Sequence, residues 1–215
     1  MTLSELTSLL FQEINFNLPG EKAHELMAPY KREKASSINI PDKNPKQSAV
    51  LMLIYPKNDI PHFTLIQRTA YEGTHGGQIS FPGGKQEAEE SLKETALRET
   101  FEEIGVAPDK IQVLGEITQI YIPPSNFLVS PFIGFVDFEP VFTPEVKEVE
   151  EIIEVKISDL TDASKIKQKK IKVGKYTETP VLIDVPYFDL NHNTVWGATA
   201  TILSEVRQML INGSK

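Results

Sequence analysis

Three glutamates lie within five residues near the end of a predicted helix. Residues 98 to 105 read RETFEEIG, so Glu99, Glu102 and Glu103 fall in the closing turn, just before Gly105. Carboxylates are disfavoured near a helix C-terminus, where the last carbonyl groups already carry partial negative charge. At about 100° per residue, the three side chains lie within an arc of roughly 100°. We therefore expect one helix face to present three carboxylates.

The same helix is expected to pack through a separate apolar stripe. Leu97, Phe101 and Ile104 fall about 140° to 200° away from Glu99 around the helix axis. The alternative for the acidic face is a solvated surface held by salt bridges, in which Arg98 pairs with acids one turn away. That alternative fits less well, because Glu99 and Glu103 are like charges one turn apart, at a cost of a few tenths of a kcal/mol. A compensating cation is the simpler account.

The residue types favour a hard divalent metal ion. The chain has no cysteine and only four histidines, so thiolate-bound zinc is excluded. Carboxylate oxygens without sulfur or paired imidazole ligands favour Mg²⁺ or Mn²⁺. Two of the acids would bind the metal, and the third would bind a second ion or take a proton from water.

Composition limits the classes of protein to which the chain belongs. Its 215 residues are 40% hydrophobic and 24% charged, which is typical of one globular domain. A formal net charge of −8 opposes general nucleic-acid binding. The first 16 residues resemble an amphipathic helix more than a signal peptide, and no apolar run reaches the roughly 18 residues that span a bilayer. We therefore expect a cytoplasmic protein with no membrane partner.

The pattern of apolar residues predicts an α/β fold. Residues 2 to 29 have helical spacing with a break at Pro19-Gly20, and the polar residues 31 to 47 connect them to the rest. We expect residues 1–47 to form a helical extension and linker packed on one main domain, residues 48–215. The sequence leaves open whether these helices build a homodimer. Strands are predicted at 48–56, 62–68, 111–121, 127–138, 169–176 and 181–188, and helices at 90–104 and 197–211.

The spacing of the acidic segment resembles the signature of the Nudix hydrolases. From Gly84 there are five residues to Glu90, seven more to Arg98-Glu99, two to Glu102-Glu103 and one to Gly105. Every fixed position of that signature matches, and Thr100 stands where the family prefers an aliphatic residue. The resemblance implies an α/β/α sandwich with a mixed sheet, and cleavage of a diphosphate joined to another group.

The resemblance also implies roles for the residues of the segment. Glu99 and Glu103 would bind Mg²⁺ or Mn²⁺, Glu102 would serve as ligand or base, and the backbone oxygen of Gly84 would be a further ligand. Arg98 would orient the acids, with Glu90 as its partner.

The residues upstream resemble the coenzyme A pyrophosphatase branch of that family. Arg68, His75 and the run from Phe81 through Gly83 to Gly84 match its motif, whereas Gly73 stands where a second Arg is usual. Residues 126–136 and 195–206 also resemble this branch. The resemblance implies that Arg68, His75, Gly83 and Gly84 contact a nucleotide diphosphate such as coenzyme A, which is split into 3′,5′-ADP and 4′-phosphopantetheine.

Several interpretations stay open at this point. Glu148 is either a base from a later loop or part of a solvated charge run. The lysine-rich residues 165–175 form either an exposed hairpin or a cradle for a 3′-phosphate, and Trp196 and Phe127 either stack on an adenine or pack in the core. The alternative substrates are ADP-ribose, a dinucleotide or a nucleoside triphosphate, and a non-catalytic nucleotide sensor is the alternative to an enzyme.

Overall fold

The architecture is given by a computed structural model. It describes residues 1–28, 43–69, 77–173 and 181–213. Most of the predicted linker, together with Gly73 and His75, lies outside the described residues.

The central sheet is built around β1 (Lys46–Lys57). β2 (Ile60–Arg68) runs antiparallel to it and β7 (Phe127–Phe135) runs parallel, so the sheet is mixed, as predicted. Within the described residues the sheet has eight strands, on the path β3-β2-β1-β7-β5 with β4, β6 and β8 paired beside it. The other strands of this sheet are β3 (Ile79–Ser80), β4 (Gly83–Lys85), β5 (Gln112–Glu116), β6 (Ile120–Ile122) and β8 (Val149–Lys156).

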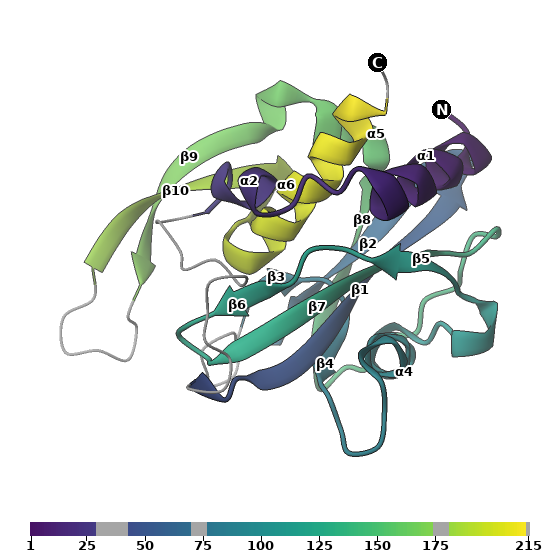
Figure 1. Ribbon diagram of the computed structural model, residues 1–215, viewed down its shortest axis with the longest axis horizontal. Coiled ribbons are helices and arrows are strands. Elements are labelled where there is room, and N and C mark those ends of the chain that lie inside the picture. Colours follow the sequence, from purple (N-terminus) through teal and green to yellow (C-terminus); the bar gives the residue numbers. More distant parts are fainter. Residues whose placement is uncertain (29–42, 70–76, 174–180, 214–215) are drawn as a thin grey trace.

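Helices cover both faces of this sheet because β1 is apolar on both sides. Leu51 and Leu53 point into one core, under α4 (Leu92–Ile104), whereas Met52 and Ile54 point into the other. Figure 1 shows α4 on one side of the sheet and α1, α2 and α6 on the opposite side. The helices of that second layer are α1 (Leu3–Phe16), α2 (Glu21–Glu25) and α6 (Gly197–Asn212), with the short α5 (Ile157–Thr161) beside α6. The predicted α/β/α sandwich is therefore confirmed.

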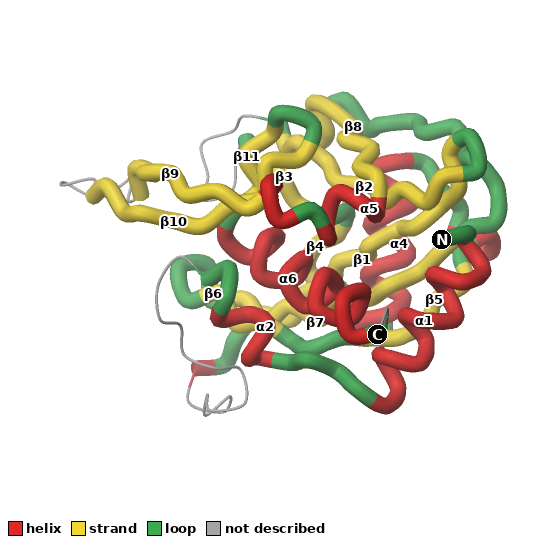
Figure 2. Tube along the Cα trace, turned by 90° about the horizontal axis from the view of Figure 1, so that it is seen from above, coloured by secondary structure: helices red, strands yellow, loops and turns green. Residues whose placement is uncertain are grey.

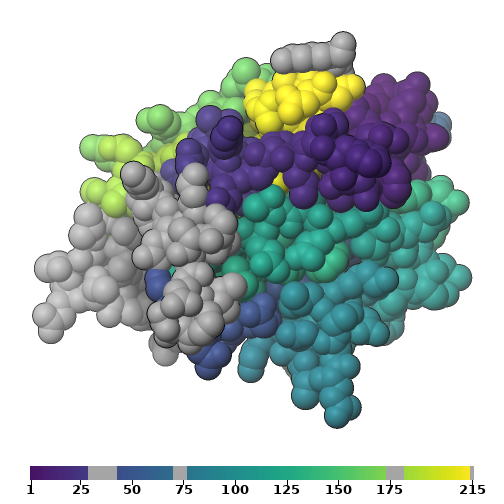
Figure 3. All heavy atoms as spheres, in the orientation of Figure 1, coloured from purple at the N-terminus to yellow at the C-terminus, as the bar shows by residue number. Residues whose placement is uncertain are grey.

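The N-terminal helices are tied to the C-terminal helix by a buried carboxylate. Glu205 of α6 is fully buried and accepts hydrogen bonds from His24 Nε2 (2.9 Å), Gly20 N (3.0 Å) and Thr118 Oγ1 (2.6 Å). A buried carboxylate is costly unless it is paired in this way. Figure 3 shows the purple N-terminal residues lying directly against the yellow C-terminal helix. The division of the chain at residue 48 and the formation of a homodimer stay predictions.

A second, smaller sheet carries the lysine-rich segment. β9 (Ile166–Val173), β10 (Val181–Leu190) and β11 (Asn193–Val195) pair in the order β11-β10-β9. β9 and β10 extend away from the body of the protein (Figure 2). The lysines of β9 at positions 167, 169, 170 and 172 are exposed, which is typical of an edge strand protected by charge.

The strand predictions differ from the structure at residues 111–121 and at β8, and the short strands β3, β4 and β11 were not predicted. The predicted strand 111–121 is divided into β5 and β6, with an irregularity between Val113 and Gly115. β8 was not predicted, because its exposed Glu150 and Glu151 resemble a solvated charge run, while Ile153 faces the core. Pairing with β2 over residues 62–68 is what makes this acidic segment a strand.

Of the helices in the described parts of the chain, none has the length and apolar character needed to cross a bilayer.

Candidate active site

The helix that carries the acidic residues has well-defined ends. Ser91 caps its N-terminus and forms a capping box with Glu94. Gly105 ends it with a φ of 79°, a left-handed conformation that glycine adopts without steric cost. Because Glu94 is engaged by Ser91, it is not the partner of Arg98 that one-turn spacing suggested.

The helix is rotated relative to the predicted apolar stripe. Ala96, Thr100 and Ile104 are buried, but Phe101 is 51% exposed, so its predicted place in the core was wrong. The small side chains of Ala96 and Thr100 allow α4 to lie close to β1, and the Thr100 hydroxyl is satisfied by the carbonyl of Ala96 at 2.7 Å. This rotation turns Glu103 toward the sheet, where it is only 1% exposed. The three acids therefore range from buried to exposed.

Glu103 is held by β2 and β4. Its Oε1 accepts a hydrogen bond from Arg68 Nη1 at 2.9 Å, and its Oε2 accepts one from the backbone N of Gly83 at 2.8 Å. Burial raises the pKa of Glu103 to about 7, although the positive charge of Arg68 acts in the opposite direction. Arg68, predicted to contact a phosphate, is thus also the ion-pair partner of a buried glutamate.

Arg98 links the other acids. Its Nε and Nη2 donate to the two carboxylate oxygens of Glu90 at 3.0 and 2.9 Å, so the predicted pairing is present. Its Nη1 lies 3.0 Å from Glu99 Oε1 and 2.8 Å from Glu102 Oε2. Arg98 can therefore set the positions of Glu99 and Glu102 relative to each other.

The absence of a side chain at Gly84 makes room for Glu99. Gly84 pairs with Ala49 of β1, and a Cβ atom at residue 84 would lie 2.4 Å from the carboxylate carbon of Glu99. Real Cβ atoms do not approach another heavy atom so closely. Burial beside the β4 backbone raises the pKa of Glu99, because the ionised carboxylate loses solvation there. The positive charge of Arg98 acts in the opposite direction.

This donor set fits a hard divalent cation. Among the described residues, no three side chains of the metal-binding types converge closely enough to hold an ion as they stand. However, Arg98 Nη1 lies beside one oxygen of Glu99 and one of Glu102, and a carboxylate has two oxygens that can each accept more than one contact, so both side chains keep the capacity to act as ligands. These oxygens and the Gly84 carbonyl are the kind of ligands that Mg²⁺ and Mn²⁺ prefer.

The other residues predicted from the sequence differ in whether they lie at the site. Gly83 lies in the site, through its contacts with Glu103 and with Arg68, and His75 lies outside the described residues. Phe127 packs against the core and Trp196 is half-buried at the start of α6.

The segment that precedes β8 carries Glu148, which the sequence left open as either a base from a later loop or part of a solvated charge run. The charge of Glu148 raises the pKa of both Glu99 and Glu103, so this residue lies within electrostatic reach of both. Its backbone oxygen also accepts a hydrogen bond from Thr69 at 2.9 Å. Forty-odd residues separate Glu148 from the acidic helix in the sequence, and no local spacing signal joins them.

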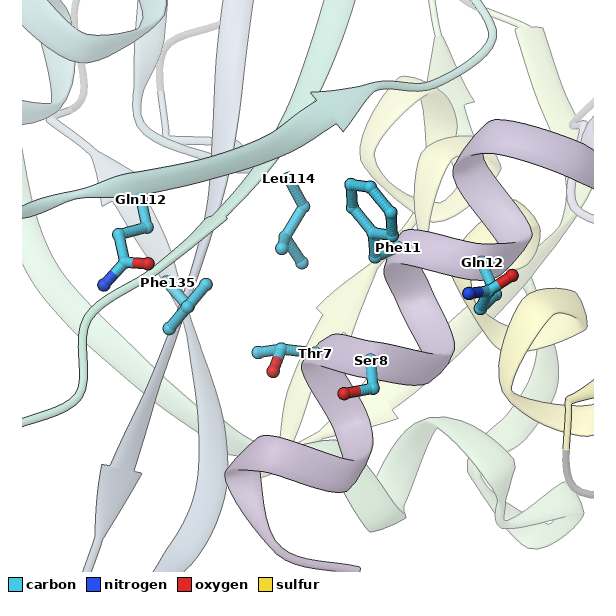
Figure 4. Close-up of a pocket in the computed structure, with 7 residues that line it drawn as sticks. All are labelled: Thr7, Ser8, Phe11, Gln12, Gln112, Leu114 and Phe135. Atoms are coloured by element: carbon cyan, nitrogen blue, oxygen red, sulfur yellow. The ribbon is translucent and has the colours of Figure 1, made fainter.

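An open pocket of about 350 Å³ lies elsewhere, between α1 and the edge strand β5. Figure 4 shows Phe11 and Thr7 of α1 facing Gln112, Leu114 and Phe135 across it. Its lining residues include no titratable group. This pocket therefore offers no side chain for acid-base chemistry.

Glu90 is expected to link stability to acidic pH. The hydrogen bond from Arg98 lowers the pKa of Glu90 to about 2, below its ordinary value near 4.5. The contribution of ionised Glu90 to the free energy of unfolding is thus complete above about pH 4.5 and is lost as the pH falls through about 2. Replacing Glu90 by Gln should lower the unfolding free energy at pH 7 by about 1.5–3 kcal/mol, and should flatten its dependence on pH below 4.5. Denaturant titrations at pH 7 and pH 3 would measure both effects.

The exposed Glu87 provides the control, and Glu87→Gln should leave stability nearly unchanged. An acid dependence of Glu90→Gln as steep as that of the wild type would contradict the assignment.

The fold and the site together define an α/β/α sandwich protein with a carboxylate-rich helix beside its central sheet. A family model described as the NUDIX domain matches residues 45–179. That span is more than half of the 215 residues, and the chain belongs to the Nudix hydrolase family. Members of this family generally require a divalent metal ion.

Named relatives agree with this assignment. The chain is 30% identical over 176 residues to the human mitochondrial coenzyme A diphosphatase NUDT8, an alignment that covers 79% of this chain and 72% of that protein. It is 30% identical over 171 residues to an uncharacterized Nudix hydrolase NudL of Pectobacterium atrosepticum, covering 75% and 81%. It is 27% identical over 207 residues to Nudix hydrolase 3 of Caenorhabditis elegans, covering 90% and 80%.

Solved structures share the fold. The Nudix hydrolase RenU of M. smegmatis superposes with a TM-score of 0.51 at 16% identity, covering 78% of this chain and 87% of that one. A MutT/nudix family protein of Enterococcus faecalis gives the same TM-score at 14% identity, covering 95% and 74%.

Proposed function

We propose that this protein is a metal-dependent diphosphatase that hydrolyses coenzyme A or its derivatives. The reaction adds one water across the P–O–P bond and releases 3′,5′-ADP and 4′-phosphopantetheine, or its acyl form. The observation that carries the proposal is the set of three glutamates on α4, held by Arg98 and Arg68 beside the Gly83-Gly84 strand. Similarity to the human coenzyme A diphosphatase supports this substrate class.

The metal site would be formed by Glu99, Glu102, Glu103 and the backbone oxygen of Gly84. A Mg²⁺ or Mn²⁺ ion held by these residues would supply positive charge against the diphosphate and would make water easier to deprotonate. Glu99 and Glu102 each place a carboxylate beside Arg98 Nη1 and keep oxygen lone pairs for a metal ion. Glu103 would need to share oxygens that already accept hydrogen bonds from Arg68 and Gly83, and carboxylate oxygens have the capacity for this.

The chain's own residues orient the reaction. One of the three carboxylates accepts the proton of the attacking water. Arg98, fixed by both oxygens of Glu90, keeps Glu99 and Glu102 in place. Arg68 positions Glu103 through Nη1, and its other N–H groups are suited to a phosphate oxygen. His75 and Gly83 complete the proposed substrate contacts.

A panel of diphosphates tests the proposal. The pure protein is incubated with Mg²⁺ or Mn²⁺ and with coenzyme A, acyl-coenzyme A, ADP-ribose, NADH or dNTPs, and the products are identified by mass. We expect coenzyme A or an acyl derivative to be cleaved fastest, giving the two products named above, and EDTA to abolish turnover. Rapid hydrolysis of ADP-ribose with coenzyme A left intact would overturn the substrate assignment.

A further inference from the structure

One short segment, residues 143–149, holds the end of the helix that carries Glu103. The N–H of Thr143 donates to the carbonyl of Ile104 at 3.0 Å, and the N–H of Glu145 donates to the carbonyl of Glu103 at 3.1 Å. The last carbonyls of a helix have no donor within the helix. The segment supplies these donors, so it fixes the backbone from which the Glu103 side chain extends.

The same segment holds the residue that follows Arg68. Thr69 donates through its backbone N to Glu148 O at 2.9 Å and through its hydroxyl to Lys147 O at 2.8 Å. Within the segment, the carbonyl of Glu145 accepts from the N–H groups of Glu148 and Val149, which closes a tight turn. A continuous chain of hydrogen bonds therefore runs from Thr69 to the backbone of Glu103.

The hydroxyl of Thr69 acts where the regular strand pairing fails. Between Gln67 and Arg68 the ladder of β2 and β8 shifts register, since Gln67 pairs with Glu151 and Arg68 with Val149. Such bulges redirect the side chains beside them. The hydrogen bonds of Thr69 come directly after this irregularity, and they fix the backbone next to Arg68.

We propose that Thr69 is a positioning residue for the hydrolysis of the diphosphate. Through Lys147, its hydroxyl sets the distance between the end of β2 and the end of α4, and thereby the contact of Arg68 with Glu103. The inference rests on the proposed function, in which Glu103 serves the reaction. A displacement of about 1 Å at such a group can cost about a hundredfold in rate, and the loss of one of two tethers should cost less.

Three variants test this role. Thr69→Val removes the hydroxyl and keeps the shape of the side chain, whereas Thr69→Ser keeps the hydroxyl. Thr161→Val is the control, because it removes a similar hydrogen bond on α5, from Thr161 Oγ1 to Ser158 O at 2.9 Å. We expect kcat/KM to fall about tenfold in Thr69→Val and to stay within about threefold of the wild type in the other two. The thermal midpoints of Thr69→Val and Thr161→Val should fall by similar amounts.

The metal-free protein gives a second measurement. The shifts in thermal midpoint caused by Thr69→Val and Glu103→Gln should be less than additive in the double variant, because both act on the same ion pair. The shifts of Thr161→Val and Glu103→Gln should be additive. Additive shifts for the Thr69 pair, or a Thr69→Val rate equal to that of Thr161→Val, would overturn the proposal.

The two proposals fail in distinguishable ways. Rates are measured with whichever diphosphate the wild type cleaves, so failure of coenzyme A as substrate does not affect the comparison of the Thr69 variants. A wild type without turnover would defeat the proposed function, and the additivity of the midpoints would still decide the role of Thr69.

Discussion

Replacing Glu103 by Gln is expected to reduce kcat by about a thousandfold or more, while the affinity for substrate changes by less than about fivefold. The substitution keeps the volume of a side chain that is only 1% exposed, but it removes the negative charge that Arg68 faces at 2.9 Å. It also replaces one acceptor oxygen by an amide group, which cannot accept a hydrogen bond. Steady-state rates give kcat, and calorimetry with uncleaved substrate gives the affinity.

Glu154 provides a matched control for this experiment. It accepts hydrogen bonds from Tyr55 at 2.6 Å and from Lys57 at 2.7 Å, and it pairs with Thr64, four residues along β2 from Arg68. Glu154→Gln should leave kcat within about twofold of the wild type. If Glu103→Gln retained more than about a tenth of the wild-type kcat, Glu103 would have no direct part in the reaction. Loss of turnover with binding retained would also separate an enzyme from a nucleotide sensor.

Alanine at the neighbouring glycines 83 and 84 should produce two opposite phenotypes. At Gly84 the new Cβ would lie 2.4 Å from the carboxylate of Glu99, the mobile end of a long side chain. We expect Gly84→Ala to displace that carboxylate and to lower kcat/KM by about a hundredfold. The thermal midpoint should change by only a few degrees, because the three atoms nearest to the new Cβ all belong to the Glu99 side chain, which can move.

At Gly83 the same methyl group would meet the backbone. A Cβ there would lie 2.4 Å from the carbonyl oxygen of Ala49 and 2.6 Å from the Cα of Val50. The ladder between β1 and β4 cannot yield to it without separating. Gly83→Ala should therefore cost about 1–3 kcal/mol or more of stability, at roughly 2–4 °C of thermal midpoint per kcal/mol. Scanning calorimetry of the two variants would compare them directly.

A double substitution makes the Gly84 prediction sharper. If alanine at this position acts only through Glu99, adding it to Glu99→Ala should cause little further loss of kcat/KM. An independent hundredfold loss in that background would show that Gly84 acts by another route, and equal thermal midpoints for Gly83→Ala and the wild type would contradict the steric argument.

The parts of the site that are local in sequence could be predicted. The resemblance to the Nudix signature, a pattern that is short in sequence, implied the pairing of Glu90 with Arg98. Gly105 predicted the end of the helix, because glycine favours the backbone conformation that ends a helix. The rotation of the helix could not be predicted from its apolar residues. Ala96 and Thr100, which are small rather than strongly apolar, form the contact with β1 and leave Phe101 half exposed.

The contacts that join distant segments gave no local signal. The segment before β8 reaches the acidic helix through backbone hydrogen bonds, which any residue type can make. Its acidic side chains resembled a solvated charge run. The exposed glutamates of β8 gave the same impression, and that strand was therefore not predicted. The ion pair between Arg68 and Glu103 likewise joins residues 35 positions apart. The pairing of β2 with β1 and the packing of α4 against β1 and β4 bring them together.

The carboxylate of Glu205 has a consequence for protein engineering. Two of the three groups that solvate it, Gly20 and His24, belong to the first 28 residues. Trimming these residues to obtain a minimal catalytic fragment would leave an uncompensated charge inside the apolar layer beneath α6. Chimeras and shortened expression variants should therefore retain α1 and α2, or remove the charge at residue 205 at the same time.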